Sequence, residues 1–162
     1  MPQRIEPFKK IVVALSGKPV NAQVVHQAVR LSTLLDTELH AVHMRFPRAG
    51  ELTMMMEPLP LYTEDDLRAQ FSERGYTELA ETIPVQIVEG TNVAKLLGEV
   101  TKGADMIIMG HRQRNRILAA LSAAPIQLQI LDVVDCPVVI VPRNDSAKER
   151  ISDFGSRSGT IV

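Results

Sequence analysis

Hydrophobic residues along the chain fall into two patterns: short apolar runs, and longer stretches in which they recur every three or four positions. The short runs are rich in Val, Ile and Leu, which is typical of strands buried in a parallel sheet. We expect such strands at residues 11–15, 37–44, 84–89, 106–109 and 136–141.

The stretches between the first three runs predict helices. A helix beginning near Asn21 would place six apolar residues on its core face: Val24, Val25, Ala28, Leu31, Leu34 and Leu35. Thr63 precedes three acidic residues and is a predicted N-cap. That second helix would turn Leu67 and Phe71 inward, weaken at Gly75 and end near Thr82.

Two more helices complete the alternation. Asn92 is a predicted N-cap for a helix that Gly103 ends. A last helix would begin near Ser122 and bury Ile126, Ile130, Leu131 and Val134. Strands alternating with helices predict an α/β domain with a five-stranded parallel sheet covered on both faces, a three-layer α/β/α arrangement. We assign it to residues 1–143.

Composition adds bounds to this fold. The 162 residues are 45% hydrophobic and 23% charged, with a formal net charge of -1, which predicts a globular domain without general attraction to nucleic acid or membrane. A single cysteine fits a reducing compartment, so we expect a cytoplasmic protein.

Two segments depart from the alternation. Residues 45–62 carry several prolines and the triplet Met54-Met55-Met56, for which we favour packing onto the core over a partner-binding surface. Residues 144–162 are polar and are predicted to form a flexible tail.

A basic loop follows the strand at residues 106–109. His111, Arg112, Arg114 and Arg116 come directly after Gly110, at the carboxyl end of a parallel strand, where open α/β sheets bind ligands. The arginines would suit phosphate or another anion, and the alternative is a solvated loop.

Several motifs are absent. Gly17-Lys18 lacks the earlier glycine and the following hydroxyl of a P-loop. His40 and His43 are three apart in a predicted strand and would face opposite ways, so we predict no metal site. Cys136 begins a buried strand and is interpreted as a small hydrophobic residue. We find no catalytic constellation and expect no enzymatic activity.

The chain resembles the universal stress protein family from residue 9 to residue 142. The resemblance rests on segments in this order: Lys10-Ile-Val-Val-Ala14, Leu39-His-Ala-Val-His43, Val88-Glu-Gly90, Ala104-Asp-Met-Ile-Ile-Met-Gly110 and Cys136-Pro-Val-Val-Ile-Val141. It implies a Rossmann-like sheet ordered 3-2-1-4-5 and a homodimer joined through the last strand, at Val138, Val139, Ile140 and Val141.

The nucleotide motif of this family is incomplete here. ATP-binding members carry Gly-x2-Gly-x9-Gly-Ser/Thr after the fourth strand, and only Gly110 matches. Gln113, Ala123 and Ala124 stand at the other positions. Ser16 replaces an aspartate after the first strand, Met44 replaces a small valine at the base pocket, and Ala14 and Arg112 complete the assigned site.

The chain therefore resembles the family's UspA-like branch, which does not bind ATP. The resemblance implies a stress-response protein that acts through protein contacts and needs no cofactor. The alternative is a module that binds AMP or ATP through the basic loop. A flavodoxin-like electron carrier is disfavoured because the chain has no Trp and only two Tyr.

Overall fold

The computed structural model describes residues 5–15, 21–45, 61–110 and 133–142. In this part of the chain the strands are β1 (Lys10–Leu15), β2 (Glu38–Arg45), β3 (Val85–Glu89), β4 (Met106–Gly110) and β5 (Val138–Val141). The helices are α1 (Ala22–Leu35), α2 (Glu64–Ser72), α3 (Thr77–Thr82) and α4 (Val93–Val100). The predicted tail at residues 144–162, the triplet Met54-Met55-Met56 and most of the predicted helix near Ser122 lie outside the described residues. Of that helix, Val134 is described: it lies outside any helix and packs against an apolar cluster.

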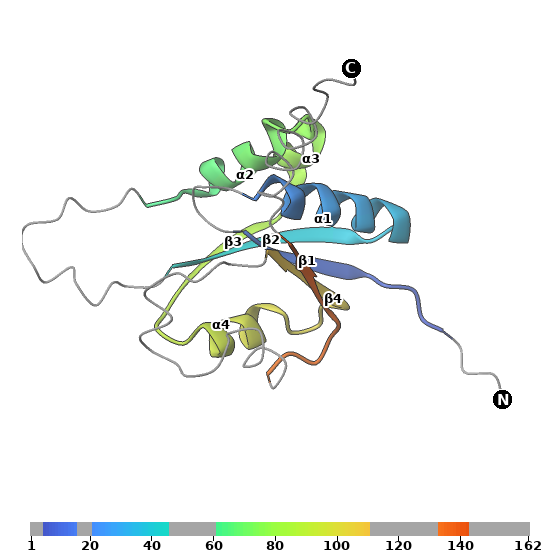
Figure 1. Cartoon of the computed structure of the whole chain (residues 1–162), viewed down its shortest axis with the longest axis vertical. Helices are drawn as coiled ribbons and strands as arrows, with labels where there is room; N and C mark the ends of the chain where they lie inside the picture. Colours follow the sequence, from blue (N-terminus) through green and yellow to red (C-terminus); the bar gives the residue numbers. More distant parts are fainter. Residues whose placement is uncertain (1–4, 16–20, 46–60, 111–132, 143–162) are drawn as a thin grey trace, which may run out of the picture.

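All five strands join one parallel sheet in the order β3-β2-β1-β4-β5 (Figure 1). The central strand is β1, in which Ile11 pairs with Leu39 of β2 on one side and with Met106 of β4 on the other. The α/β fold, the parallel sheet and its strand order are therefore confirmed. The described strands begin or end within two residues of the predicted runs.

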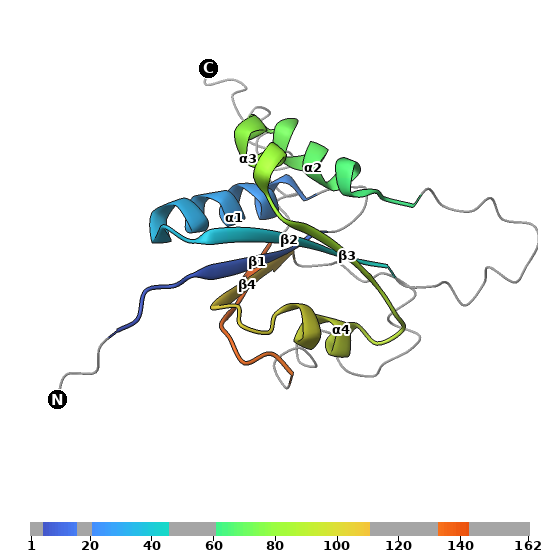
Figure 2. The ribbon, with the colours of Figure 1, turned by 180° about the vertical axis from the view of Figure 1, so that it is seen from behind.

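Helices cover both faces of the sheet, as two opposite views agree: α1, α2 and α3 lie on one face and α4 on the other (Figures 1 and 2). Successive strand residues point to opposite faces, so β1 and β4 contribute to both cores. Ile108 packs with Phe71 of α2 in the larger cluster, whereas Ile107 packs with Leu97 of α4 in the second.

Each long helix begins at a side chain that accepts a backbone N–H. Asn21 caps α1 through Gln23, and Asn92 caps α4 through Lys95. Thr63 forms a capping box with Asp66 at the start of α2. The two N-caps predicted from the sequence, Thr63 and Asn92, are confirmed, and α1 begins at Asn21 as predicted.

The prediction for the core face of α1 was wrong at Leu34 and Leu35. Leu34 is 70% exposed and Leu35 is 40% exposed, whereas Ser32 is buried. Leu34 follows Ser32 by two residues, which rotates it by about 200° to the far side of the helix. Leu35 is the last residue of α1, and Asp36, in the left-handed conformation, turns the chain toward β2.

The single helix predicted after Thr63 is divided into α2 and α3. Gly75 adopts a φ of 87°, which an α-helix does not permit, so the helix is interrupted at the position where the sequence predicted only a weakening. Arg68 of α2 secures the second piece because its Nη1 donates to the carbonyl oxygens of Ala80 at 3.0 Å and Ile83 at 2.6 Å. Within the described ranges, no helix is long and apolar enough to cross a membrane.

Candidate functional site

Three residues of the predicted nucleotide site, Ala14, Met44 and Gly110, are described by the structure. They lie at or near the ends of β1, β2 and β4, which are neighbours in the sheet. Parallel strands end at a common edge, so the structure brings these residues to the carboxyl edge, where such sheets hold ligands. The other predicted site residues lie outside the described residues: Ser16, Arg112, Gln113, Ala123 and Ala124.

Gly110 faces the first turn of α1. A Cβ built on Gly110 would lie 3.0 Å from Cγ2 of Val24 and 3.3 Å from Nδ2 of Asn21. Val24 is buried, so it has little room to move away. The glycine therefore allows α1 to approach β4 closely. The sequence analysis assigned Gly110 to a nucleotide site, because nothing local in the sequence reveals which helix crosses a strand end.

Ala14 and Met44 belong to the opposite face of the sheet. Both pack against the second apolar cluster, whose buried members are Leu97, Ile107 and Met109. The methionine side chain thus forms part of the packing under α4 instead of bordering an empty hollow. The structure brings the three predicted residues to one edge but divides them between two faces.

The N-terminus of α1 adds a polar group beside Gly110, the side-chain amide of Asn21, that the sequence analysis did not single out. The side-chain oxygen of Asn21 accepts from the backbone N–H of Gln23 at 3.1 Å. Its Nδ2 is buried and has no hydrogen-bond partner among the described residues. One amide donor therefore stands at the carboxyl edge between α1 and the end of β4.

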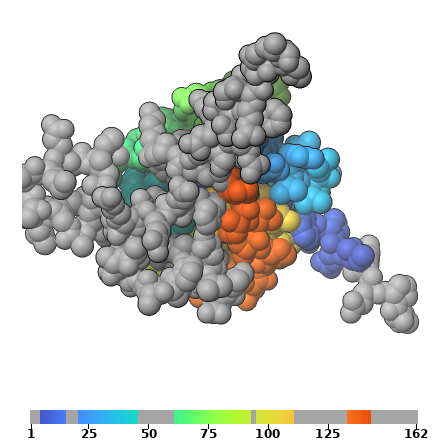
Figure 3. Space-filling model, viewed as in Figure 1, coloured from blue at the N-terminus to red at the C-terminus, as the bar shows by residue number. Residues whose placement is uncertain are grey.

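The predicted dimer strand β5 lies at one side of the sheet, where β4 is its neighbour. Val138, Val139 and Ile140 are half-buried and Val141 is buried. Figure 3 shows this segment in orange at the surface. A groove of about 270 Å³ runs beside it, lined by Gln23 and Gln27 of α1 and by residues 139–142.

The two histidines of β2 have separate environments. His40 lies with its Nε2 3.3 Å from Oε2 of Glu38 at the protein surface. His43 is buried, and its Nδ1 lies 2.9 Å from the carbonyl oxygen of Leu15. In the part of the chain that the structure describes, no three His, Cys, Asp or Glu side chains are placed to hold a metal ion.

The opposite, amino edge of the sheet is held by Asp105, which sequence reasoning did not single out. Its Oδ2 accepts the backbone N–H groups of Lys9 at 2.7 Å and Lys10 at 2.9 Å. These bonds fix the start of β1 to the residue before β4. They also lower the pKa of the Asp105 carboxyl, because they stabilise its charged form.

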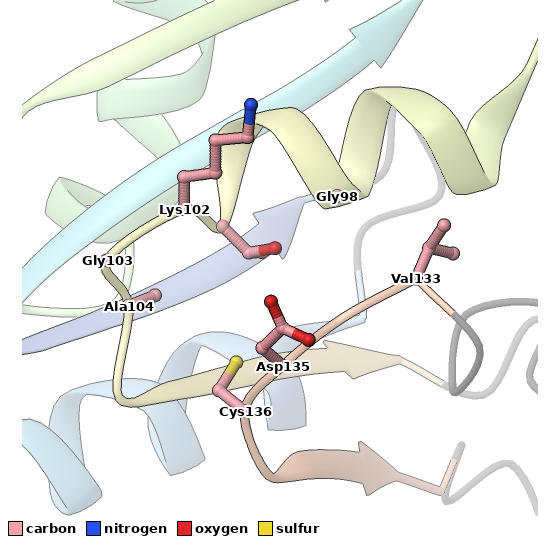
Figure 4. Close-up of a pocket in the computed structure, with 8 residues that line it drawn as sticks. Gly98, Lys102, Gly103, Ala104, Val133, Asp135 and Cys136 are labelled. Carbon is pink, nitrogen blue, oxygen red and sulfur yellow. The ribbon is translucent and has the colours of Figure 1, made fainter.

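A cavity of about 110 Å³ lies near this amino edge, between the end of α4 and the segment that leads into β5 (Figure 4). The side chains of Asp135 and Cys136 point from that segment toward the end of α4. Burial, followed by the charges of Asp105 and Asp135, raises the pKa of the Cys136 thiol. The raised pKa agrees with the interpretation of Cys136 as an unreactive residue.

The described elements define a doubly wound α/β protein with its candidate site at the carboxyl edge of the sheet. The model of the universal stress protein family matches residues 7–142. The chain belongs to this family. Among curated proteins, none matches the chain in sequence.

Solved structures of universal stress proteins share the fold. A universal stress protein in complex with cAMP is 17% identical, with a TM-score of 0.57, covering 85% of this chain and 99% of that chain. UspA from Lactobacillus plantarum is 14% identical, with a TM-score of 0.55 and the same coverages. A universal stress protein from Archaeoglobus fulgidus DSM 4304 is 21% identical, with a TM-score of 0.54, covering 86% of this chain and 46% of that chain.

Proposed function

We propose that this universal stress protein is a non-enzymatic, cytoplasmic stress-response regulator, which acts as a homodimer through protein contacts and has a degenerate nucleotide site. The packing around Gly110 carries this proposal. The one glycine that matches the ATP-binding motif accommodates α1, with Val24 Cγ2 at 3.0 Å from a Cβ built there. In the sequence, Gln113 and Ala123 replace the other two glycines of the motif, which leave backbone N–H groups open to phosphates, and Ala124 replaces the Ser/Thr hydroxyl.

The packing on the other face supports the same proposal. Met44 stands where the family's base pocket has a small residue, and its side chain packs against the apolar cluster under α4. A base entering there would have to displace a side chain that already contributes buried contacts. Nucleotide affinity would be reduced by that cost.

The edge strand β5 supports the homodimer. Its backbone hydrogen-bonding groups on the side away from β4 face no other strand of the described sheet. Its apolar residues invite pairing with a second chain, and antiparallel pairing of two such edges would close a two-fold dimer.

The substitution Val139→Lys tests the interface. A like charge on both copies would oppose pairing, so light scattering after size exclusion should give the mass of a monomer. Leu34→Lys is the control for an added surface charge, because Leu34 is apolar and 70% exposed near the end of α1. A Val139→Lys variant that keeps its far-UV circular dichroism and remains a dimer would exclude this interface.

The alternative is a module that binds AMP, ATP or a related anion, and the amide of Asn21 favours it. Its buried Nδ2, beside Gly110, is a donor for which the described residues offer no acceptor. The cAMP complex of the relative with a TM-score of 0.57 places a nucleotide on a protein of this fold.

Calorimetry with Mg-ATP and with AMP at millimolar concentration separates the two functions. No heat is expected if the site is degenerate. Micromolar binding that Asn21→Ser abolishes would instead support the alternative, because serine keeps a capping oxygen and removes the amide donor.

A further inference from the structure

Two His–Tyr ring pairs of nearly the same geometry lie on the face covered by α1, α2 and α3. The rings of His26 and Tyr76 are 5.6 Å apart at 72°, and those of His43 and Tyr62 are 5.5 Å apart at 68°. The first pair joins α1 to the turn between α2 and α3. The second joins β2 to the residue just before the N-cap of α2.

His43 also contacts the end of β1. The ring is 8% exposed, and its Nδ1 lies 2.9 Å from the carbonyl oxygen of Leu15, the last residue of that strand. Because a carbonyl oxygen only accepts, Nδ1 must carry the hydrogen and donate it. The imidazole of His43 therefore contacts two elements: it donates a hydrogen bond to Leu15 at the end of β1, called here the exit of β1, and its ring packs against the ring of Tyr62.

Tyr62 is in turn fastened to α2. The next residue, Thr63, is the N-cap, whose backbone N–H donates to Oδ2 of Asp66 at 2.7 Å while its hydroxyl accepts from the backbone of Asp66 at 3.2 Å. The carbonyl oxygen of Tyr62 accepts from Nη2 of Arg45, at the end of β2. Tyr62 cannot move far without disturbing the first turn of α2.

We propose that His43 is a conformational joint that couples the exit of β1 to the start of α2, so that local opening at either end promotes opening at the other. The coupling follows from the described contacts and is independent of the proposed function. A ligand or partner that holds the exit of β1 then also steadies the first turn of α2, which exposes Glu64, Asp65 and Asp66.

Hydrogen exchange on the full chain, followed by mass spectrometry, tests the joint with two variants. His43→Phe keeps a ring beside Tyr62 but removes the bond to Leu15. Tyr62→Leu removes the ring contact but keeps that bond. If the ends are coupled, each variant speeds exchange both at residues 12–15 and at residues 63–67, by roughly fivefold, the factor expected for one lost contact of this kind.

Tyr76→Leu is the control, since it breaks the other His–Tyr pair, both its ring contact and the 2.7 Å hydrogen bond between the Tyr76 hydroxyl and Nδ1 of His26. It should speed exchange near the α2–α3 turn and leave residues 12–15 unchanged. The joint is refuted if His43→Phe affects only residues 12–15 and Tyr62→Leu affects only residues 63–67. Should His43→Phe fail to fold, Tyr62→Leu alone decides, because Tyr62 is only partly buried.

Discussion

The two edges of the sheet are held together in different ways. At the carboxyl edge, Gly110 lets α1 come so close that a single added carbon would meet Val24. At the amino edge, a carboxylate, Asp105, accepts two backbone N–H groups at the start of β1, those of Lys9 and Lys10. The first contact depends on the absence of a side chain, and the second depends on the charge of one.

This difference bears on how motifs are interpreted. A glycine at the carboxyl edge of an α/β sheet is readily assigned to phosphate binding, because ligands lie at that edge. Here the close packing of α1 against β4 is enough to explain why Gly110 is a glycine. The two backbone hydrogen bonds are likewise enough to explain the aspartate at position 105. Neither residue requires a ligand to explain it.

Gly110→Ala should have the largest effect. The added methyl must displace Val24, whose side chain is 4% exposed, so we expect a loss of about 1–3 kcal/mol in the free energy of unfolding. Urea denaturation measures it. In a Val24→Ala background the same substitution should cost less, because the clashing methyl is gone. Equal costs in both backgrounds would mean that Gly110 is not constrained by α1.

The fold was predictable because its signals are local. The apolar runs predict the strands β1 and β4 from consecutive residues alone. Thr63 and Asn92 each predict a helix start from the few residues that follow them. The strand order came from the family resemblance, since periodicity alone does not set the order of strands. The division of α2 from α3 depended on whether Gly75 takes a positive φ, which the residue permits but does not require.

The candidate site was less predictable because its contacts are distant in the sequence. Val24 and Gly110 are separated by most of the chain, and only the folded sheet brings α1 over the end of β4. Asp105 binds Lys9 and Lys10 across a separation of more than ninety residues. Residue types identify such positions as candidates, but which partner each one meets is set by topology.

Asp105→Asn should have a smaller effect, because this carboxylate lies near the surface. Its lowered pKa means that it stabilises the folded state above the ordinary aspartate pKa of about 3.9, and that this contribution is lost as pH falls through the folded value. The variant should therefore have a lower urea midpoint than the parent at pH 7, and the two should converge in acid. Asp135→Asn, at a neighbouring exposed acid, is the control. A difference that persists unchanged below both pKa values would exclude the charge as its cause.

Cys136 gives the smallest effect, on a reaction rate and not on stability. Burial and the charges of Asp105 and Asp135 raise the pKa of its thiol, so the reactive thiolate is scarcer than in an unfolded chain at the same pH. Alkylation by iodoacetamide at pH 8 should be slower in the folded protein than in urea, and the folded rate should keep rising above the ordinary thiol pKa of about 8.5. Asp135→Asn should speed the folded reaction modestly, because it removes one of the two negative charges. If the folded protein reacts as fast as the urea-unfolded chain, the charges and burial at the amino edge do not suppress the reactivity of the Cys136 thiol.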